Sequence, residues 1–296
     1  MAQTRFIVPG EQISRTPMLK LARANKLAAE THQDFVAWRE SGSPHTRAEF
    51  STDRKTALLR AALPSEPPID DWALRYGDAV HNYRSALDGL AWEVAHLDGA
   101  RPHSNAASKL YFPMAKTESR WDELARTTLA SVPDDVLARI RSVQPFMASD
   151  PRAFALPLLH KLDLDDKHRA ALQVRLTTRD REALTLIMRF QPGHPIEGDP
   201  IVEDGYEFLA HGLEVHNGLK IARLRARVPF EDVSIQTLPL RLDTSVRGEQ
   251  HGAFELLRAI DRHVTGVFMI VLLGGLVPEW TNFVAVGAPR PATPWI

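Results

Sequence analysis

The chain has no cysteine among its 296 residues. This absence excludes disulfide bonds, thiolate metal sites and a cysteine nucleophile. The net charge of -1, from 36 basic and 37 acidic residues, gives no overall attraction to nucleic acid or anionic membranes, although a local basic patch is compatible with it. The amino terminus has no apolar signal core, and the longest apolar run, residues 264–277, is too short and too rich in glycine to span a bilayer. We therefore expect a cytoplasmic protein without a membrane partner.

Several recognisable site motifs are also missing. The sequence contains no phosphate-binding glycine loop, no GxSxG nucleophile elbow and no dinucleotide-binding fingerprint. We therefore expect no cofactor. The hydrophobic share of 44% and the charged share of 25% are ordinary for a globular protein.

The most informative stretch that is present is DDWALRYGDAVHNYRSALDGLAWEVAH, residues 70–96. It is the longest helical pattern, and its apolar residues recur at three- and four-residue steps along one face: Trp72, Tyr76, Val80, Tyr83, Leu87, Leu90 and Val94. The opposite face is polar and holds Asp78, His81, Asn82, Ser85 and Asp88, with Arg84 on its flank. Because Gly89 and Trp92 also lie on this polar face, we expect a second element to pack there and partly bury the polar groups.

The remaining pattern predicts an α+β fold. We expect further helices over residues 17–38, 121–129, 133–143 and 152–164, and a β-hairpin of strands 46–50 and 56–63. Later strands are predicted over 171–177, 182–190, 219–227 and 233–242, and a last helix, buried in its second half, begins near Gly252. The predicted organisation is a helical N-terminal half with a hairpin, residues 1–169, and a β-rich half, residues 170–296, closed by the long helix. Both halves are expected to share one core.

A second polar cluster is HKLDLDDKHR, residues 160–169. Its acidic residues do not form a calcium loop, because His168 stands at the sixth position, where a glycine makes the sharp turn. A metal site built from His81, His160, Asp166 and His168 is chemically allowed but lacks the HExxH spacing, so we predict no metal. The simplest interpretation is structural: Arg84 pairs with Asp166 or Asp88, and His168 fixes a helix end.

Three segments carry a resemblance to a known family. GDAVHNYRSALDGLAWEVA (residues 77–95), LLHKLDLDDKHR (158–169) and LARANKLAAE (21–30) resemble an uncharacterised family of actinobacteria and their phages, which pairs a GDxxHNLRSALDxLAW helix with a DKHR segment. The resemblance covers roughly the first 170 residues and implies no established activity. The chain departs from the pattern at Tyr83, where leucine is usual, at Gly89, where a histidine or another larger residue is common, and at Leu164, where a polar residue is frequent.

The chain is more distantly similar to HEPN-type helical ribonucleases, in which an arginine is followed five positions later by a histidine, used in pairs across a dimer. In such an enzyme the histidine acts on the ribose 2'-hydroxyl and the arginine holds the phosphate. Here Gly89 occupies the histidine position after Arg84. The pairs Arg258–His263 and Arg189–His194 have the spacing, but about one such match is expected by chance, so two matches carry almost no weight, and the Arg258 helix is expected to be buried.

The polar cluster is predicted to be mainly structural, and the best specific activity is metal-independent RNA cleavage, HEPN-like and related to defence or phages. The predicted catalytic residues are Arg84, Asp88 and His168, and the predicted binding residues are His81, Asn82, Asp166, Lys167 and Arg169. RNA and a second copy of the chain are the predicted partners. The alternative is a non-enzymatic partner-binding or homo-oligomeric assembly module that uses the tail at Trp295–Ile296.

A stripe of Arg223, Arg225 and Arg227 along one strand suggests either a phosphate-facing surface or the solvated face of a half-buried sheet.

Overall fold

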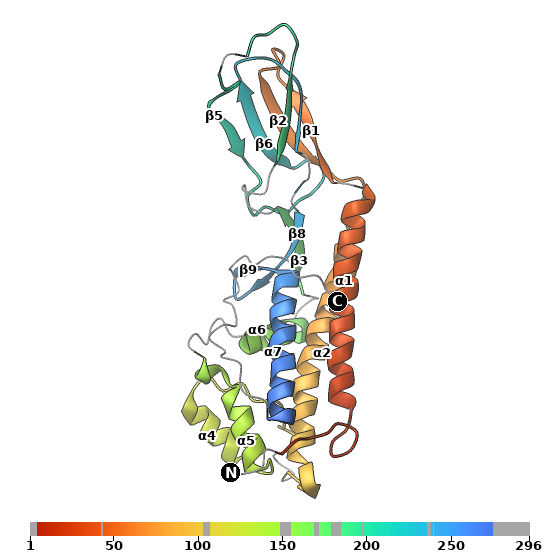
Figure 1. Ribbon diagram of the computed structural model, residues 1–296, viewed down its shortest axis with the longest axis vertical. Helices are drawn as coiled ribbons and strands as arrows, with labels where there is room; N and C mark the ends of the chain where they lie inside the picture. Colours follow the sequence, from red (N-terminus) through yellow and green to blue (C-terminus); the bar gives the residue numbers. More distant parts are fainter. Residues whose placement is uncertain are drawn as a thin grey trace. The chain divides into compact units, whose positions relative to one another are not determined.

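The computed structural model describes residues 5–42, 44–102, 107–148, 155–168, 172–178, 185–196, 198–235, 238 and 240–274. The predicted α+β class is confirmed, with helices and one β-hairpin before residue 169, further antiparallel strands after it and the long helix α7 (Ala253–Leu273) at the end (Figure 1). Within these ranges, no helix is long and apolar enough to cross a membrane. The chain forms two compact units: the first takes Met1–Thr31, Ala73–Leu172 and Ser245–Ile296, and the second takes His32–Trp72 and Gln173–Thr244.

The predicted helices of the N-terminal half are all present. They are α1 (Thr16–Gly42), α2 (Ile69–Ala95), α4 (Glu118–Arg126), α5 (Asp134–Ser142) and α6 (Ala155–His168), with short 3-10 helices η1 (Leu97–Gly99) and η2 (Pro145–Met147). Pro17 and Pro157 lie in the first turns of α1 and α6. A proline is tolerated there because the N–H groups of a first helical turn have no partner within the helix.

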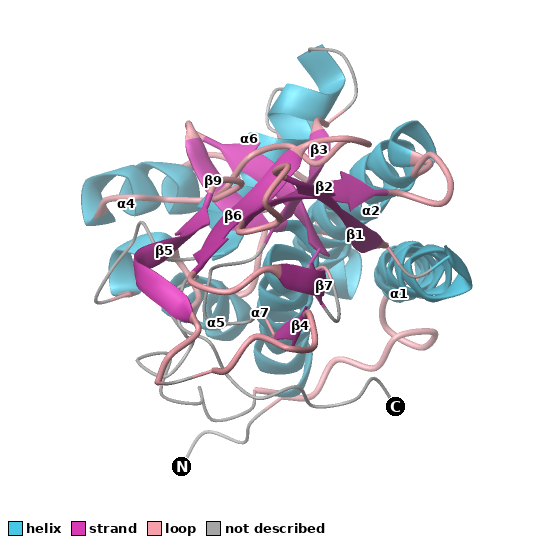
Figure 2. Cartoon of the chain, turned by 90° about the horizontal axis from the view of Figure 1, so that it is seen from above, coloured by secondary structure: helices cyan, strands magenta, loops and turns pink. Residues whose placement is uncertain are grey.

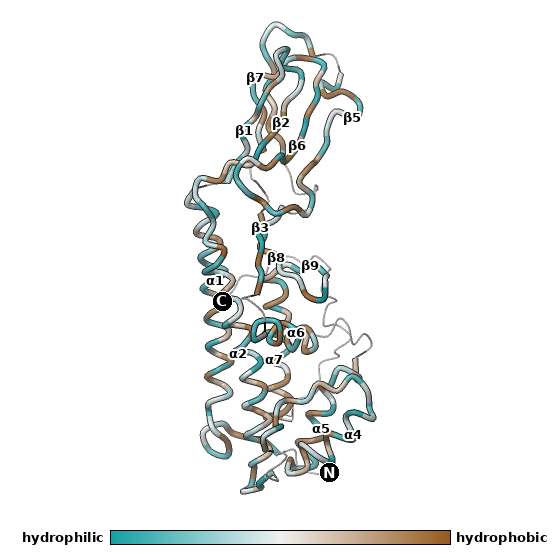
Figure 3. The backbone as a smooth tube through the Cα atoms, turned by 180° about the vertical axis from the view of Figure 1, so that it is seen from behind, coloured by the Kyte–Doolittle hydropathy of each residue, from teal (hydrophilic) through white to brown (hydrophobic). Residues whose placement is uncertain are grey.

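The core of the first unit is formed by the apolar faces of its long helices. The stripe on α2 is fully buried in this unit, at Tyr76, Val80, Tyr83, Leu87, Leu90 and Val94. Helix α7 buries most of its second half as predicted, although Met269 and Leu273 remain exposed. Figure 3 shows the concentration of hydrophobic residues along α7, and Figures 1 and 2 show α2 and α7 side by side in two views.

Hydrogen bonds among Tyr83, Asn25 and Asp261 link three helices of this unit. The Tyr83 hydroxyl of α2 donates a hydrogen bond to Asn25 Oδ1 of α1 at 2.6 Å. Asn25 also hydrogen-bonds the carboxylate of Asp261 on α7, and burial raises the pKa of Asp261. The hydroxyl of Tyr83 therefore has a structural partner at a position where the resembled family usually has leucine.

The strands agree with the prediction in part. The hairpin of β1 (His45–Phe50) and β2 (Thr56–Ala62) is confirmed, as are β3 (Val174–Thr178), β4 (Leu186–Phe190) and β6 (Lys220–Ala226). The single strand predicted over 233–242 is wrong: it is the end of β7 (Phe230–Ile235) and the start of β8 (Leu240–Val246). Pro239 stands between them and has no N–H to donate to a sheet.

Two further strands were not predicted, β5 (Ile201–Phe208) and β9 (Glu249–Gly252). The start of β5 falls in the stretch 191–205, which reads as a turn-rich loop. Its register against β6 shifts between Ile201 and Tyr206, and Asp204 has a φ of 55°. The strand therefore contains a bulge. Because the residues of that bulge are typical of turns, the sequence predicts a loop where the structure has a strand.

The strand pairs β1–β2, β2–β6, β5–β6, β3–β8 and β4–β7 are antiparallel. In the described part of the chain the strands form three sheets, with the orders β1-β2-β6-β5, β3-β8-β9 and β4-β7. In the second unit, the inner face of the four-stranded sheet is apolar, with Ala57, Leu59, Ala222 and Leu224 buried. Phe230 of β7 lies against Phe50 at 6.3 Å and stacks on Phe190 at 5.3 Å between ring centroids. Each unit thus has an apolar core of its own, and a single core shared by the two halves of the sequence stays a prediction.

Candidate functional site

The polar face of α2 is packed by α6, both in the first unit. The α6 side chains at His160, Asp163 and Lys167 follow a three- and four-residue spacing and so share one face. Gly77 of α2 allows a close approach, because a Cβ atom there would lie only 2.6 Å from Asp166 Oδ1. The second element expected on the polar face of α2 is therefore α6.

The buried Arg84 and the one-third exposed Asp88 form an ion pair that also holds the connection after α2. Arg84 Nη2 lies 2.8 Å from Asp88 Oδ1, and Arg84 Nε donates to Asp88 Oδ2 at 3.1 Å. Both side chains also bond the backbone of Phe112: Arg84 Nη2 donates to its carbonyl at 3.2 Å, and its N–H donates to Asp88 Oδ1 at 2.9 Å. Burial raises the pKa of Asp88, and the charge of Arg84 opposes that rise. Most polar atoms of this pair are thus engaged by the protein itself, as in a structural pair.

His81 and Asp163 make a different kind of contact. His81 Nδ1 lies 3.1 Å from Asp163 Oδ1, and the His81 side chain is 47% exposed while that of Asp163 is 4% exposed. Asp163 Oδ2 accepts a second bond from Lys167 Nζ at 2.7 Å. Because an ionised carboxylate only accepts hydrogen bonds, Asp163 favours the His81 tautomer that carries its proton on Nδ1. Nε2 of a half-exposed imidazole is then left as a proton acceptor.

The Nε2 atom of His81 already faces a hydroxyl. Ser85 Oγ lies 3.3 Å from it, one helical turn further along α2. The Ser85–His81–Asp163 series therefore has the order hydroxyl, imidazole, buried carboxylate that general-base catalysis requires.

His160 adds a second imidazole close to the same carboxylates. Burial lowers its pKa and the charge of Arg84 lowers it further, while the charges of Asp163 and Asp88 raise it. The net effect is a pKa of His160 below its ordinary value. Neither His160 nor Asp163 was among the predicted site residues, although the spacing 160, 163, 167 in the sequence places them on one face with Lys167.

The remaining predicted site residues lie as follows. Asn82 Nδ2 donates to the Asp78 carbonyl of its own helix at 2.8 Å. Asp166 lies beside Gly77, and Lys167 pairs with Asp163. His168 is the last residue of α6, and no position of its side chain is described; Arg169 and the Trp295–Ile296 tail lie outside the described residues. The structure thus brings His81, Lys167 and Asp163 together, and the catalytic roles of Arg84, Asp88 and His168 stay predictions.

Two further sequence features are the possible metal site and the Arg258–His263 pair. In the described part of the chain, no group of three or more His, Asp or Glu side chains is placed to hold a metal ion. His263 is 1% exposed within α7, and burial lowers its pKa to about 3, so the burial expected for the Arg258–His263 pair is confirmed at the histidine.

No model of a protein family, no curated protein and no solved structure matches this chain. The resemblance to the actinobacterial and phage family stays a prediction.

Proposed function

We propose that this protein cleaves RNA without a metal ion, with His81 as the general base. The observation that carries the proposal is the contact between a half-exposed imidazole and a buried carboxylate, His81 Nδ1 to Asp163 Oδ1 at 3.1 Å. A buried carboxylate fixes the tautomer and orientation of the imidazole, and so leaves Nε2 ready to accept a proton.

The reaction would be a transesterification within the RNA strand. His81 Nε2 takes the proton of a ribose 2'-hydroxyl, and the 2'-oxygen attacks the adjacent phosphorus. The bond from phosphorus to the 5'-oxygen breaks, the leaving oxygen takes a proton from solvent, and the products are a 2',3'-cyclic phosphate and a 5'-hydroxyl. The Ser85 hydroxyl occupies the place of the substrate hydroxyl at Nε2 until RNA binds. Lys167, with a side chain 44% exposed, supplies positive charge for the phosphate.

In this proposal Arg84 and Asp88 are positioning residues. They hold the Phe112 backbone against α2 and do not touch the reacting atoms. The general base is therefore His81, which the sequence predicts only as a binding residue, and not one of the predicted catalytic residues.

The test is cleavage of a labelled single-stranded RNA in the presence of EDTA. His81→Gln should lower the rate by about 100-fold to 10,000-fold, the usual contribution of a positioned general base. His96→Gln is the matched control, because His96 lies on the turn following α2, where its Nδ1 donates to the Trp92 carbonyl at 2.8 Å and its ring lies against Trp92. Equal rates for wild type and His81→Gln would refute the proposal.

The same geometry favours one second candidate, hydrolysis of an ester with Ser85 as nucleophile. The position of Ser85 argues against it, because the N–H groups in the interior of α2 donate within the helix and cannot form an oxyanion hole. Ser85→Ala separates the two candidates: it should leave RNA cleavage within a few-fold of wild type, whereas it would abolish serine-dependent ester hydrolysis.

The remaining functional predictions are a cytoplasmic location, a homodimer, a relation to phage defence, and the alternative of a non-enzymatic partner-binding or assembly module. A chain that binds a partner but shows no cleavage in the RNA assay would favour that alternative.

A further inference from the structure

The outer face of the sheet β1-β2-β6-β5 carries an excess of positive charge. Among the described outward positions with a cross-strand partner, the cations are Arg47, Arg60, Lys220, Arg223 and Arg225, and the carboxylates are Glu49 and Glu207. The register pairs Arg47 with Arg60 and Arg60 with Lys220, so cations face each other across three strands. A local excess of this kind stands out in a chain whose net charge is -1.

The carboxylates on this face bind their arginines only weakly. Arg60 Nε lies 2.7 Å from Glu49 Oε1, and Arg223 Nη1 lies 3.1 Å from Glu207 Oε2. Both glutamates are more than half exposed, at 58% and 56%. Exposed ion pairs contribute little free energy, so a phosphate can replace Glu207 as the partner of Arg223. The Arg60 guanidinium is less accessible, because its Nε is buried and its Nη1 donates to the Gly218 carbonyl at 3.1 Å.

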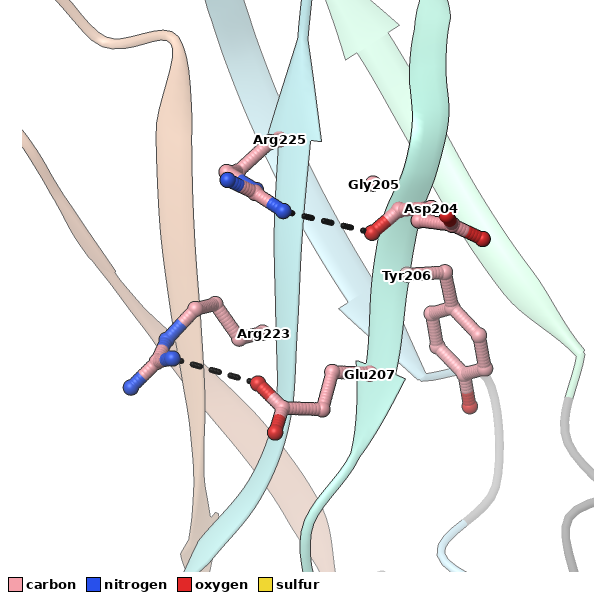
Figure 4. Close-up of a pocket in the computed structure, with 6 residues that line it drawn as sticks. All are labelled: Asp204, Gly205, Tyr206, Glu207, Arg223 and Arg225. Carbon is pink, nitrogen blue, oxygen red and sulfur yellow. Dashed lines mark hydrogen bonds and ion pairs between the residues drawn. The ribbon is translucent and has the colours of Figure 1, made fainter.

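Arg225 is held toward the same face by the bulge in β5 (Figure 4). Arg225 Nη2 donates to the carbonyl oxygen of Asp204 at 3.4 Å, a neutral partner, and the Asp204 carboxylate points away from it. The bulge requires Gly205, because a Cβ atom there would lie 2.6 Å from the Arg225 carbonyl oxygen. Together with Tyr206, Glu207 and Arg223, these residues line a hollow of about 480 Å³.

We propose that this face binds the phosphodiester backbone of a nucleic acid without reading its bases. Guanidinium groups match phosphate with two parallel hydrogen bonds, and four of the five cations are arginines. The described outward positions with a cross-strand partner include no Phe, Tyr or Trp on which a base could stack, and Tyr206 of the hollow pairs with the buried Leu224 of the inner face, so we expect binding to be independent of sequence. Protein interfaces are centred on apolar and aromatic residues, whereas among the outward neighbours of Arg223 and Arg225 only Leu58 is apolar, and this favours a nucleic acid over an acidic protein.

The inference does not depend on the proposed cleavage. Binding is measured with the His81→Gln chain, in which we expect cleavage to be slowed, and a DNA probe, which has no 2'-hydroxyl, reports binding without cleavage, so a failure to bind and a failure to cleave are observed separately. The probes are a fluorescein-labelled 20-nucleotide single-stranded RNA and the DNA of the same sequence, followed by fluorescence anisotropy as the salt concentration is raised.

The test variant is Arg223→Gln/Arg225→Gln in that chain. Loss of two phosphate contacts should make the slope of log K against log salt shallower by about 1.4 and weaken binding at low salt roughly tenfold or more. The matched control is Arg175→Gln/Arg189→Gln, which changes two exposed arginines that also pair with exposed carboxylates but lie on β3 and β4, in other sheets.

We expect RNA and DNA to bind equally and the control to bind like the parent. The proposal is overturned if the parent chain does not bind, if test and control variants lose the same affinity, or if polyglutamate of equal charge competes as well as RNA, which would indicate an acidic protein partner. Circular dichroism melting of each variant checks that the fold is kept.

Discussion

At the scale of single residues, burial separates two kinds of polar group on α2. Arg84 is 4% exposed and has its hydrogen bonds to Asp88 and Phe112, whereas the His81 side chain is 47% exposed and has one nitrogen fixed by Asp163. The sequence places both residues on the polar face of the same helix. It cannot tell them apart, because the difference lies in partners 28 and 82 positions away.

Asp88→Ala should lower the free energy of unfolding by about 3 kcal/mol. The substitution leaves the buried Arg84 charge and the Phe112 N–H without their partner, and the value lies at the low end of the range for such losses because Asp88 is one-third exposed. Urea denaturation measures the change. Glu123→Ala is the control, since Glu123 pairs with Arg120 on the surface, and its loss should cost less than about 1 kcal/mol. Equal effects of the two substitutions would contradict the structural role of Asp88.

His263 should make the protein less stable in acid. Its pKa is about 3 in the folded state against 6.5 in the unfolded chain, so the unfolded state binds the proton more readily. The stability from the neutral imidazole is complete above pH 6.5 and falls as the pH drops toward 3. Between pH 7 and pH 5 the loss is roughly 2 kcal/mol.

The measurement is denaturant unfolding at both pH values. His263→Met should remove most of this difference, because Met has no titrating group, whereas His96→Gln should retain it. A His263→Met chain with the same acid sensitivity as wild type would show that other groups cause it.

At the scale of elements, the sequence predicts helices and faces well but not partners. The hydrophobic periodicity of residues 70–96 predicts the ends of α2 and its buried stripe, and the polar residues between the two strands predict the β1–β2 hairpin. The same local signals fail at β5, where a bulge with Asp204 and Gly205 resembles a loop. They also cannot show that β2 pairs with β6 or that α6 packs on α2, because these contacts join residues more than 80 positions apart.

The contact of α2 with α6 at Gly77 can be tested by a double-mutant cycle. Gly77→Ala alone should destabilise the protein by about 1–2 kcal/mol, because the new methyl group meets the Asp166 carboxylate. In an Asp166→Ala background the same change should instead stabilise by up to about 1 kcal/mol, the ordinary preference of a helix for alanine over glycine. Thermal or urea unfolding of the four chains measures the cycle. The same sign of effect in both backgrounds would contradict the close approach.

At the scale of the whole molecule, each compact unit combines segments from distant parts of the sequence. The second unit joins His32–Trp72 to Gln173–Thr244, and the first unit needs α7 from the end of the described chain. The change from helix-rich to β-rich sequence near residue 169 is therefore a change in secondary structure, and both units contain residues from each side of it.

Fragments cut at that point should not fold alone. A fragment of residues 1–169 keeps β1 and β2 but loses β6, the partner of β2, and loses α7 from the helical core. We expect it to show no cooperative urea transition by circular dichroism. A sharp transition in the isolated fragment, comparable with that of the full chain, would contradict the arrangement of the units.

The central claim is that His81 acts as a general base on a ribose 2'-hydroxyl. The most direct measurement is mass spectrometry of the products that the full chain makes, in EDTA, from a short RNA and from the same RNA with a single 2'-deoxyribose at the cleaved position. We expect a 2',3'-cyclic phosphate from the first and no cleavage at the deoxy position in the second. Cleavage at the deoxy position, or products that carry a 5'-phosphate, would contradict it.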